Sequence, residues 1–279
     1  MKYMYITNDP QVAMIAQKYG VDRVWIDLEV RGKEERQRGM NSVKSQHCIN
    51  DIRIIKPLLS SSEMLVRVNP WYENSVEEIN EVIEAGADII MLPMWRSCAE
   101  VNAFIKAVNN RAKTVLLLET KEAEKCLDDV LSFCRPDEIH IGLNDLHLSY
   151  GLTFMFELLS NGTVEKICEK IRKSGLPYGF GGIASIGDGL LPARKILMEH
   201  FRLGSDRVIL SRSFCNASEI KDIGEIDRIF GINMRKMREC EHEISHCSID
   251  DFETNKNDVA FCVNSIVNEI KQNRRATCN

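Results

Sequence analysis

The sequence lacks three features that would place the chain in a specialised class of protein. It has no apolar run of the roughly 18 to 20 residues that a membrane-spanning helix needs. It has no stripe of basic residues, and its net charge is -5, so we expect no nucleic-acid partner. Its 10 cysteines include no C-x-x-C pair. We therefore expect a soluble protein without a membrane or nucleic-acid partner.

The scattered cysteines and the lack of an N-terminal signal peptide predict a cellular location. Disulfide-rich and zinc-binding proteins space their cysteines in compact patterns, and none is present in this chain. We expect reduced thiols in the cytoplasm, with most cysteines serving as packing residues.

Eight short apolar segments alternate with segments of helical spacing. The predicted strands cover residues 1–6, 22–28, 64–68, 89–93, 114–119, 138–141, 178–183 and 207–210. This count and spacing predict an α/β protein with a (β/α)₈ barrel over residues 1–245. A doubly wound open sheet is the alternative, but such sheets often carry a glycine-rich turn after their first strand, and here that turn reads Thr-Asn-Asp-Pro.

The last part of the chain, residues 246–279, is predicted to be a helical extension. We expect a polar linker followed by a short amphipathic helix whose apolar stripe includes Val259, Val263 and Val267. That stripe would pack on a neighbouring subunit of a homo-oligomer or on the chain's own barrel. The sequence leaves both possibilities open.

Active sites of such barrels lie at the carboxyl ends of the strands. The residues at these ends are therefore the candidate functional residues. The polar residues and glycines at these ends include Asp27, Glu29, Arg67, Glu119, Asn144, Asp145 and Gly182. Glu119 and Asp145 end adjacent strands and could share one hard cation such as Mg²⁺ or Mn²⁺. Asp145 alone would also suit a turn or a helix N-cap. Gly182 could present its amide to a carboxylate or allow close backbone packing.

Five motifs in the same order carry a family resemblance. They are Asp27-Leu-Glu29, Val-Arg67-Val-Asn-Pro, Gly86-Ala-Asp-x-x-x-Leu-Pro93-Met, Glu119 after a leucine run, and Gly142-Leu-Asn-Asp145-Leu. Over residues 1–215 the chain resembles the HpcH/HpaI aldolase and citrate lyase β-chain family of pyruvate and phosphoenolpyruvate barrels.

This resemblance implies a metal-dependent carbon-carbon lyase. It implies that Glu119 and Asp145 hold the metal, which acts as a Lewis acid on the enolate of pyruvate or a related 2-oxo acid. Arg67 would stabilise the developing negative charge, and the amides around Asn144 and Asp145 would hold the substrate carboxylate. The second substrate would be an aldehyde or an acyl compound, and no organic cofactor is expected. Other chemistry at the same site, such as acyl cleavage or thioester hydrolysis, and binding without turnover remain alternatives.

The chain departs from the family at the end of the second strand. Aldolases of this group have a histidine directly after Asp-x-Glu, whereas this chain has Val30 after Glu29. His47 and His147 are the two candidates for the missing acid/base group, although a loop histidine is often only an exposed residue.

Two aromatic pairs also follow strand ends. Trp71-Tyr72 and Trp95-Arg96 could line a pocket for a larger, sugar-like substrate or pack in the core.

Overall fold

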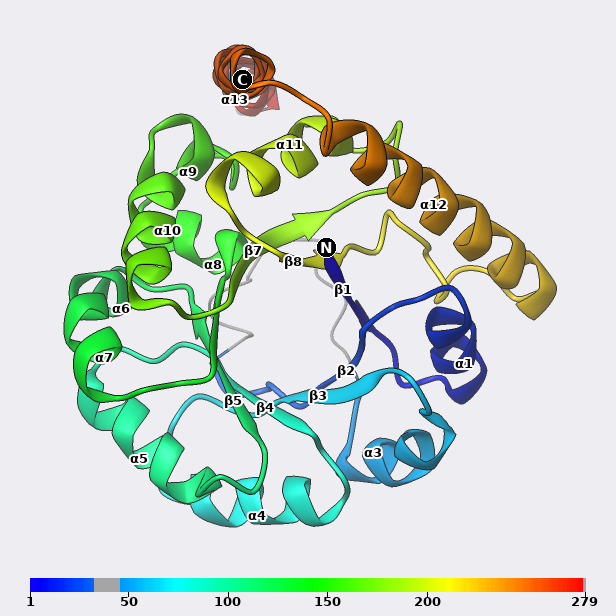
Figure 1. Cartoon of the computed structure of the whole chain (residues 1–279), viewed down its shortest axis with the longest axis vertical. Coiled ribbons are helices and arrows are strands. Elements are labelled where there is room, and N and C mark those ends of the chain that lie inside the picture. Colours follow the sequence, from blue (N-terminus) through cyan, green and yellow to red (C-terminus); the bar gives the residue numbers. More distant parts are fainter. Residues whose placement is uncertain (33–45, 278–279) are drawn as a thin grey trace.

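The computed structural model describes residues 1–32 and 46–277, and its centre is a closed barrel of eight parallel strands (Figure 1). The strands are β1 (Lys2–Ile6), β2 (Arg23–Asp27), β3 (Glu63–Arg67), β4 (Ile89–Leu92), β5 (Lys113–Leu118), β6 (Glu138–Ile141), β7 (Tyr178–Ile183) and β8 (Arg207–Leu210). Each strand pairs with the next, and β8 pairs with β1 to close the barrel. The predicted (β/α)₈ fold is confirmed.

Helices surround the barrel on its outer side (Figure 1). They are α1 (Pro10–Lys18), α3 (Ile49–Ile55), the 3₁₀ turn η1 (Lys56–Leu58), α4 (Ser75–Glu84), α5 (Cys98–Val108), α6 (Lys121–Lys125), α7 (Leu127–Phe133), α8 (Leu143–Ser149), α9 (Glu157–Ser160), α10 (Thr163–Ser174), α11 (Ala193–Leu203), α12 (Ile223–Ile244) and α13 (Ile249–Thr277). Helices α8, α9 and α10 were not predicted from the sequence. None of the helices in the described part is long and apolar enough to cross a membrane.

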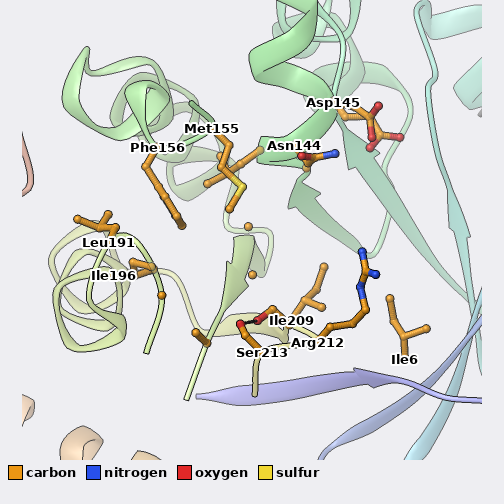
Figure 2. A pocket seen from close by; sticks show the side chains of 18 of the residues that line it. Ile6, Asn144, Asp145, Met155, Phe156, Leu191, Ile196, Ile209, Arg212 and Ser213 are labelled. Carbon is orange, nitrogen blue, oxygen red and sulfur yellow. Dashed lines mark hydrogen bonds between the residues drawn. The ribbon is translucent and has the colours of Figure 1, made fainter. Parts of the chain in front are cut away.

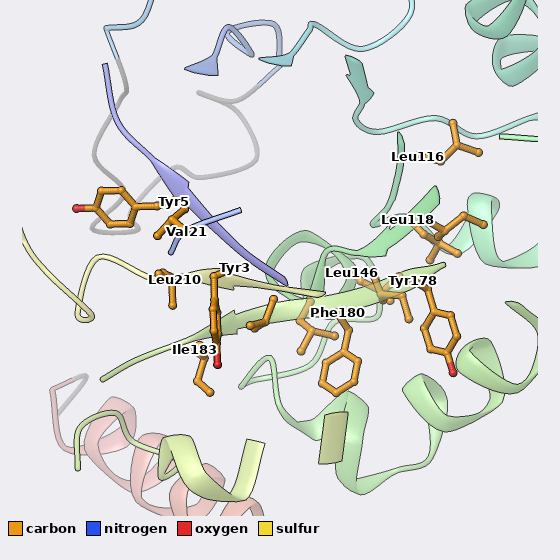
Figure 3. Packing of buried hydrophobic residues seen from close by; sticks show 14 of the residues in the cluster. Tyr3, Tyr5, Val21, Leu116, Leu118, Leu146, Tyr178, Phe180, Ile183 and Leu210 are labelled. Carbon is orange, nitrogen blue, oxygen red and sulfur yellow. The ribbon is translucent and has the colours of Figure 1, made fainter. Parts of the chain in front are cut away.

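The main hydrophobic core lies between the strands and the helices. Alternate strand residues such as Tyr3, Phe180 and Leu210 point outward into this layer, where they meet helix residues such as Leu146 (Figure 3). Parallel strands covered on both faces are apolar almost throughout, which explains why their positions could be read from the sequence.

The inside of the barrel is filled in layers. At the amino-terminal end, Glu138 accepts two hydrogen bonds from Arg23, at 2.7 and 2.6 Å, and forms an ion pair with Arg207 at 2.8 Å. Above these charges lies an apolar layer of Met4, Trp25, Leu65, Ile89, Met91, Val115 and Leu117. The third layer, at the carboxyl ends of the strands, is again charged and is described below.

The carboxyl-terminal extension differs from the prediction. One continuous helix, α13, starts at Ile249, so the expectation of a polar linker and a short helix was wrong. Its apolar stripe, with Val259 and Val263 fully buried, packs against α9 and α11 of the same chain. Contact with a neighbouring subunit stays a prediction.

Two buried histidines make the stability of the fold depend on pH. Burial lowers the pKa of His140, on β6, to about 4, and its ring lies 3.1 Å from the carbonyl oxygen of Gly181. Burial also holds the pKa of His200 well below its usual range, and this ring stacks on Phe180 at 3.7 Å. Both side chains are therefore neutral in the folded protein near neutral pH.

We predict that the free energy of unfolding falls as the pH drops from about 6.5 to about 4. The unfolded chain binds protons at these histidines near pH 6.5, whereas folded His140 binds one only near pH 4, so acid favours unfolding. The contribution of His140 is about 3 kcal/mol, present above pH 6.5 and lost toward pH 4. Urea unfolding across this range checks it. His140→Gln should flatten the profile, and His242→Gln, on the surface of α12, controls for the loss of a histidine. An unchanged profile in His140→Gln would contradict the prediction.

Candidate active site

A pocket of 530 Å³ opens at the carboxyl ends of the strands (Figure 2). Its walls include five of the residues that the sequence nominated: Arg67, Glu119, Asn144, Asp145 and Gly182. They come from β3, from the ends of β5 and β6, and from β7, so the barrel brings together residues that are far apart in the sequence.

Glu119 directly follows β5 and is held in place by its neighbours. The main-chain N–H of Met94 donates to Glu119 Oε1 at 3.0 Å, from a backbone in the left-handed region with a φ of 53°. The next residue, Thr120, caps α6 by accepting from Ala123 N–H. A non-glycine residue with positive φ stores strain, and such strain is typical of functional sites.

Asp145 lies in the first turn of α8, one strand along from Glu119. A carboxylate is favourable at this end of a helix because the peptide dipoles point their positive ends toward it. Burial, followed by the negative charges of Asp145 and Glu29, raises the pKa of Glu119 well above its usual range. The two candidate metal ligands are thus close enough to repel each other strongly.

Gly142, the residue before α8, makes this arrangement possible. A Cβ atom at this position would lie 2.8 Å from Glu119 Oε2 and 3.0 Å from Glu119 Cβ. Any larger residue would push the glutamate side chain out of place.

Arg67 is fixed in a fork of two carboxylates. Its Nε and Nη2 atoms each donate to an oxygen of Asp27 at 2.8 Å, and Nη1 lies 3.2 Å from Glu29 Oε2. The guanidinium also lies over the Trp25 ring at 5.3 Å. Burial opposes the charged form, but Asp27 and Glu29 outweigh it and raise the pKa of Arg67. Arg67 is therefore a permanent cation, and two of its five N–H groups take no part in these contacts with Asp27 and Glu29.

Two further candidates, Glu29 beside Arg67 and His47 beside the main chain of Asp27, are not among the residues that line the pocket. His47 Nδ1 accepts the main-chain N–H of Asp27 at 2.9 Å. The neutral ring then carries its proton on Nε2. The other histidine candidate, His147, is buried in α8 with its Nδ1 atom 3.2 Å from the carbonyl oxygen of Leu143. The structure thus places His47 against the main chain of Asp27, whereas His147 bonds within its own helix.

Three parts of the pocket were missed by sequence reasoning. Arg212 follows β8, and its side chain extends between Ile6 and Ile209 toward Asn144 and Asp145 (Figure 2). Trp25 forms part of the floor, and the segment Phe154 to Phe156 forms a side wall. Arg212 could have been found by applying the strand-end rule to the eighth strand, whereas Phe154 to Phe156 belong to a loop without a periodic pattern.

The predicted aromatic pairs do not line this pocket. Trp95 is fully buried in the main core, and Trp71 packs against the same core. The sugar-pocket interpretation of Trp71-Tyr72 and Trp95-Arg96 was wrong, and the core-packing alternative holds for both tryptophans.

Comparison with known proteins supplies the family. The family model described as HpcH/HpaI aldolase/citrate lyase matches residues 3–175. The chain belongs to the HpcH/HpaI aldolase/citrate lyase family. Its members are lyase-type enzymes, which supports a lyase-type function for this chain in general terms. No curated protein matches the chain in sequence.

Solved structures share the fold at low sequence identity. A family protein from Burkholderia cenocepacia J2315 is 13% identical with a TM-score of 0.62, over 81% of this chain and 94% of that one. An HpcH/HpaI aldolase from Desulfitobacterium hafniense DCB-2 is 12% identical with a TM-score of 0.56, over 85% and 93%. A variant of the citrate synthase SbnG is 16% identical with a TM-score of 0.56, over 85% and 94%. These likenesses show the barrel fold.

We predict that Gly142→Ala destabilises the protein by about 1–3 kcal/mol, because the added methyl group overlaps Glu119 in a packed interior. Thermal and urea unfolding measure the change. Gly224→Ala, in the first turn of α12, is the matched control, since its Cβ would meet the nearest atom at 3.5 Å, an ordinary contact. If Gly142→Ala and the wild-type protein have the same free energy of unfolding, the Glu119 side chain can shift without destabilising the fold, which would contradict the prediction.

Proposed function

We propose that the protein is a divalent-metal-dependent carbon-carbon lyase that cleaves or forms a 2-oxo acid through an enolate of pyruvate. The observation that carries this proposal is the pair of buried Glu119 and half-buried Asp145, which follow neighbouring strands and line one pocket with Arg67 and Asn144. Family membership supports the reaction class.

The donor set suits Mg²⁺ or Mn²⁺. Glu119, which is buried, and Asp145, which is half-buried, offer hard oxygen ligands, and a divalent cation between them would offset the repulsion of their charges. In the described part of the chain no group of three or more His, Cys, Asp or Glu residues could hold a metal, so water and substrate would complete the coordination. When bound at Glu119 and Asp145, the cation supplies Lewis-acid polarisation of the oxo-acid oxygens. The proposal needs no organic cofactor.

Arginine and amide side chains orient the oxo acid. Arg67 cannot rotate away, because Asp27 and Glu29 grip three of its N–H groups, so the remaining two are aimed in a fixed direction. A preorganised cation of this kind stabilises a developing enolate oxygen without a cost of reorganisation. The Asn144 amide and the main chain at Gly182 lie in the same pocket and would bind the carboxylate.

Arg212 adds a second cation at the pocket wall. Among residues 1–32 and 46–277 its side chain makes no hydrogen bond or ion pair. Because the charge of Arg67 is already balanced by two carboxylates, Arg212 is the stronger candidate to hold an anionic group of the substrate.

His47 takes the place of the missing strand-two histidine in a modified role. With Nδ1 accepting from Asp27 N–H, a neutral ring carries its proton on Nε2. A neutral imidazole with a fixed proton is an effective donor to an oxygen that gains negative charge. We propose His47 as the donor to the oxygen of the aldehyde or acyl partner, which it would reach from its place beside Asp27 outside the pocket lining, and Glu29 as the residue that holds Arg67.

We predict that the purified protein with Mn²⁺ or Mg²⁺ exchanges the methyl protons of pyruvate in deuterated water, as followed by proton NMR. Glu119→Gln and Asp145→Asn should each lower Mn²⁺ affinity at least about tenfold and abolish the exchange, because each removes one of two charged ligands. Asp128→Asn, an exposed carboxylate on α7, is the control. Full metal affinity in both variants would refute the site, whereas intact binding without exchange under either metal would refute the lyase reaction.

A second prediction separates donor from base at His47. His47→Leu should leave pyruvate proton exchange within about twofold but slow aldol cleavage by about 10²–10³, the usual loss on removing one oxyanion donor. His47→Gln, which keeps an N–H donor, should recover part of the rate. If exchange and cleavage fall together in both variants, His47 is the base that removes the methyl proton.

A further inference from the structure

The pocket is larger than a three-carbon oxo acid requires. Its volume of 530 Å³ falls in the range of about 300–1,000 Å³ that is typical of sites for much larger ligands. Asn144 and Asp145 lie together at one end, with the Arg212 side chain extending toward them (Figure 2), and Arg67 and Glu119 line the same pocket. The opposite end remains for the second substrate.

That opposite end is apolar. Figure 2 shows Met155 and Phe156 on one side and Leu191 and Ile196 on the other, and their chain neighbours Phe154 and Leu190 also line the pocket. We call these six residues the apolar end of the pocket. None of the six has a polar side chain, and the two serines that also line the pocket, Ser211 and Ser213, hydrogen-bond to each other at 2.8 Å. Hydroxyl groups of a ligand placed against the six residues would therefore lose water and gain few side-chain partners.

The wall on the α9 side is held rigidly before any ligand binds. The main-chain N–H groups of Thr153 and Phe154 both donate to Glu157 Oε2, at 2.7 and 2.8 Å. The Phe154 and Phe156 rings pack edge to face with centroids 5.3 Å apart. A preformed apolar wall binds a ligand without the cost of ordering the protein.

The wall on the α11 side includes an apolar residue that the fold leaves in water. Leu190 is 71% exposed, while Leu191 and Ile196 behind it are 1% and 3% exposed. Glycines with positive φ at Gly187 and Gly189 shape the loop that presents Leu190. A bound apolar group would cover this side chain and gain the corresponding hydrophobic free energy.

We propose that the second substrate carries an apolar group, a hydrocarbon chain or ring, which binds in the apolar end between Phe154–Phe156 and Leu190–Ile196. This inference rests on the proposed lyase function for the position of the oxo acid. It excludes polyhydroxylated, sugar-like aldehydes as preferred partners.

The test compares aldehydes that differ in chain length and polarity, with the full chain, pyruvate and Mn²⁺. From propanal to hexanal, kcat/KM should rise roughly fourfold for each methylene, the usual gain on moving one CH₂ group out of water. Butanal should exceed erythrose, which has the same number of carbons, by at least about tenfold, because hydroxyl groups would be buried without partners. A flat series or a preference for erythrose would overturn the inference.

Variants locate the effect at the apolar end. Leu190→Gln should flatten the chain-length dependence and should not impair folding, because this side chain is largely in water. Phe133→Gln on α7 is the matched control, with an apolar side chain that is 75% exposed far from the pocket. Equal chain-length dependence in both variants would show that the apolar end does not bind the hydrocarbon chain of the aldehyde.

A binding measurement keeps this inference separate from the lyase proposal. Calorimetric titration with hexan-1-ol, and with erythritol for comparison, needs no turnover. Hexan-1-ol binding that Leu190→Gln weakens and Phe133→Gln does not supports the apolar end even if pyruvate shows no proton exchange. Proton exchange together with equal binding of hexan-1-ol and erythritol would uphold the lyase and reject the inference.

Discussion

Closure of the parallel barrel is the constraint on which the rest of the molecule depends. Because β8 pairs with β1, all eight strands deliver their carboxyl ends to one mouth. Glu119 and Asp145 are 26 positions apart and Arg67 precedes them by many more, yet all three line one pocket. The hydrogen bonds between the eight strands hold the two carboxylates near each other although their charges repel.

At the mouth of the barrel, the free-energy cost of burying charged side chains is opposed by the pairing of opposite charges. Burial penalises Arg67, Glu119 and their partners alike, and the pairing of Arg67 with Asp27 and Glu29 offsets part of that penalty. Glu119 has no such direct ion pair with Arg67 in the described residues, and its raised pKa is the sign of the imbalance. If the proposed cation binds here, its charge would lower this cost, and its affinity would be coupled to the stability of the fold.

The sequence predicted the framework well and the walls of the site poorly, for physical reasons. Buried parallel strands such as Leu116–Leu118 are apolar on both faces, and strand ends carry polar residues such as Glu119 and Asp145, so simple rules locate both. Phe154 and Leu190 lie in loops, where side-chain direction depends on contacts such as those of Glu157 and not on any period. The long α13 was missed because its first half is polar, although residues 249–277 contain neither proline nor glycine to interrupt a helix.

The apolar layer inside the barrel separates two charged layers with different tasks. At the amino-terminal end Arg23 and Arg207 share Glu138, and each has a second acidic partner, Glu63 and Asp206 respectively, so these charges are balanced within the fold and line no part of the pocket. Substitutions at the amino-terminal end would change the stability of the protein, while substitutions at the mouth would change its substrate specificity. Such a barrel can acquire new substrates over evolutionary time without rebuilding its foundation, which fits the preservation of the architecture among proteins that share only 12–16% of their residues with this chain.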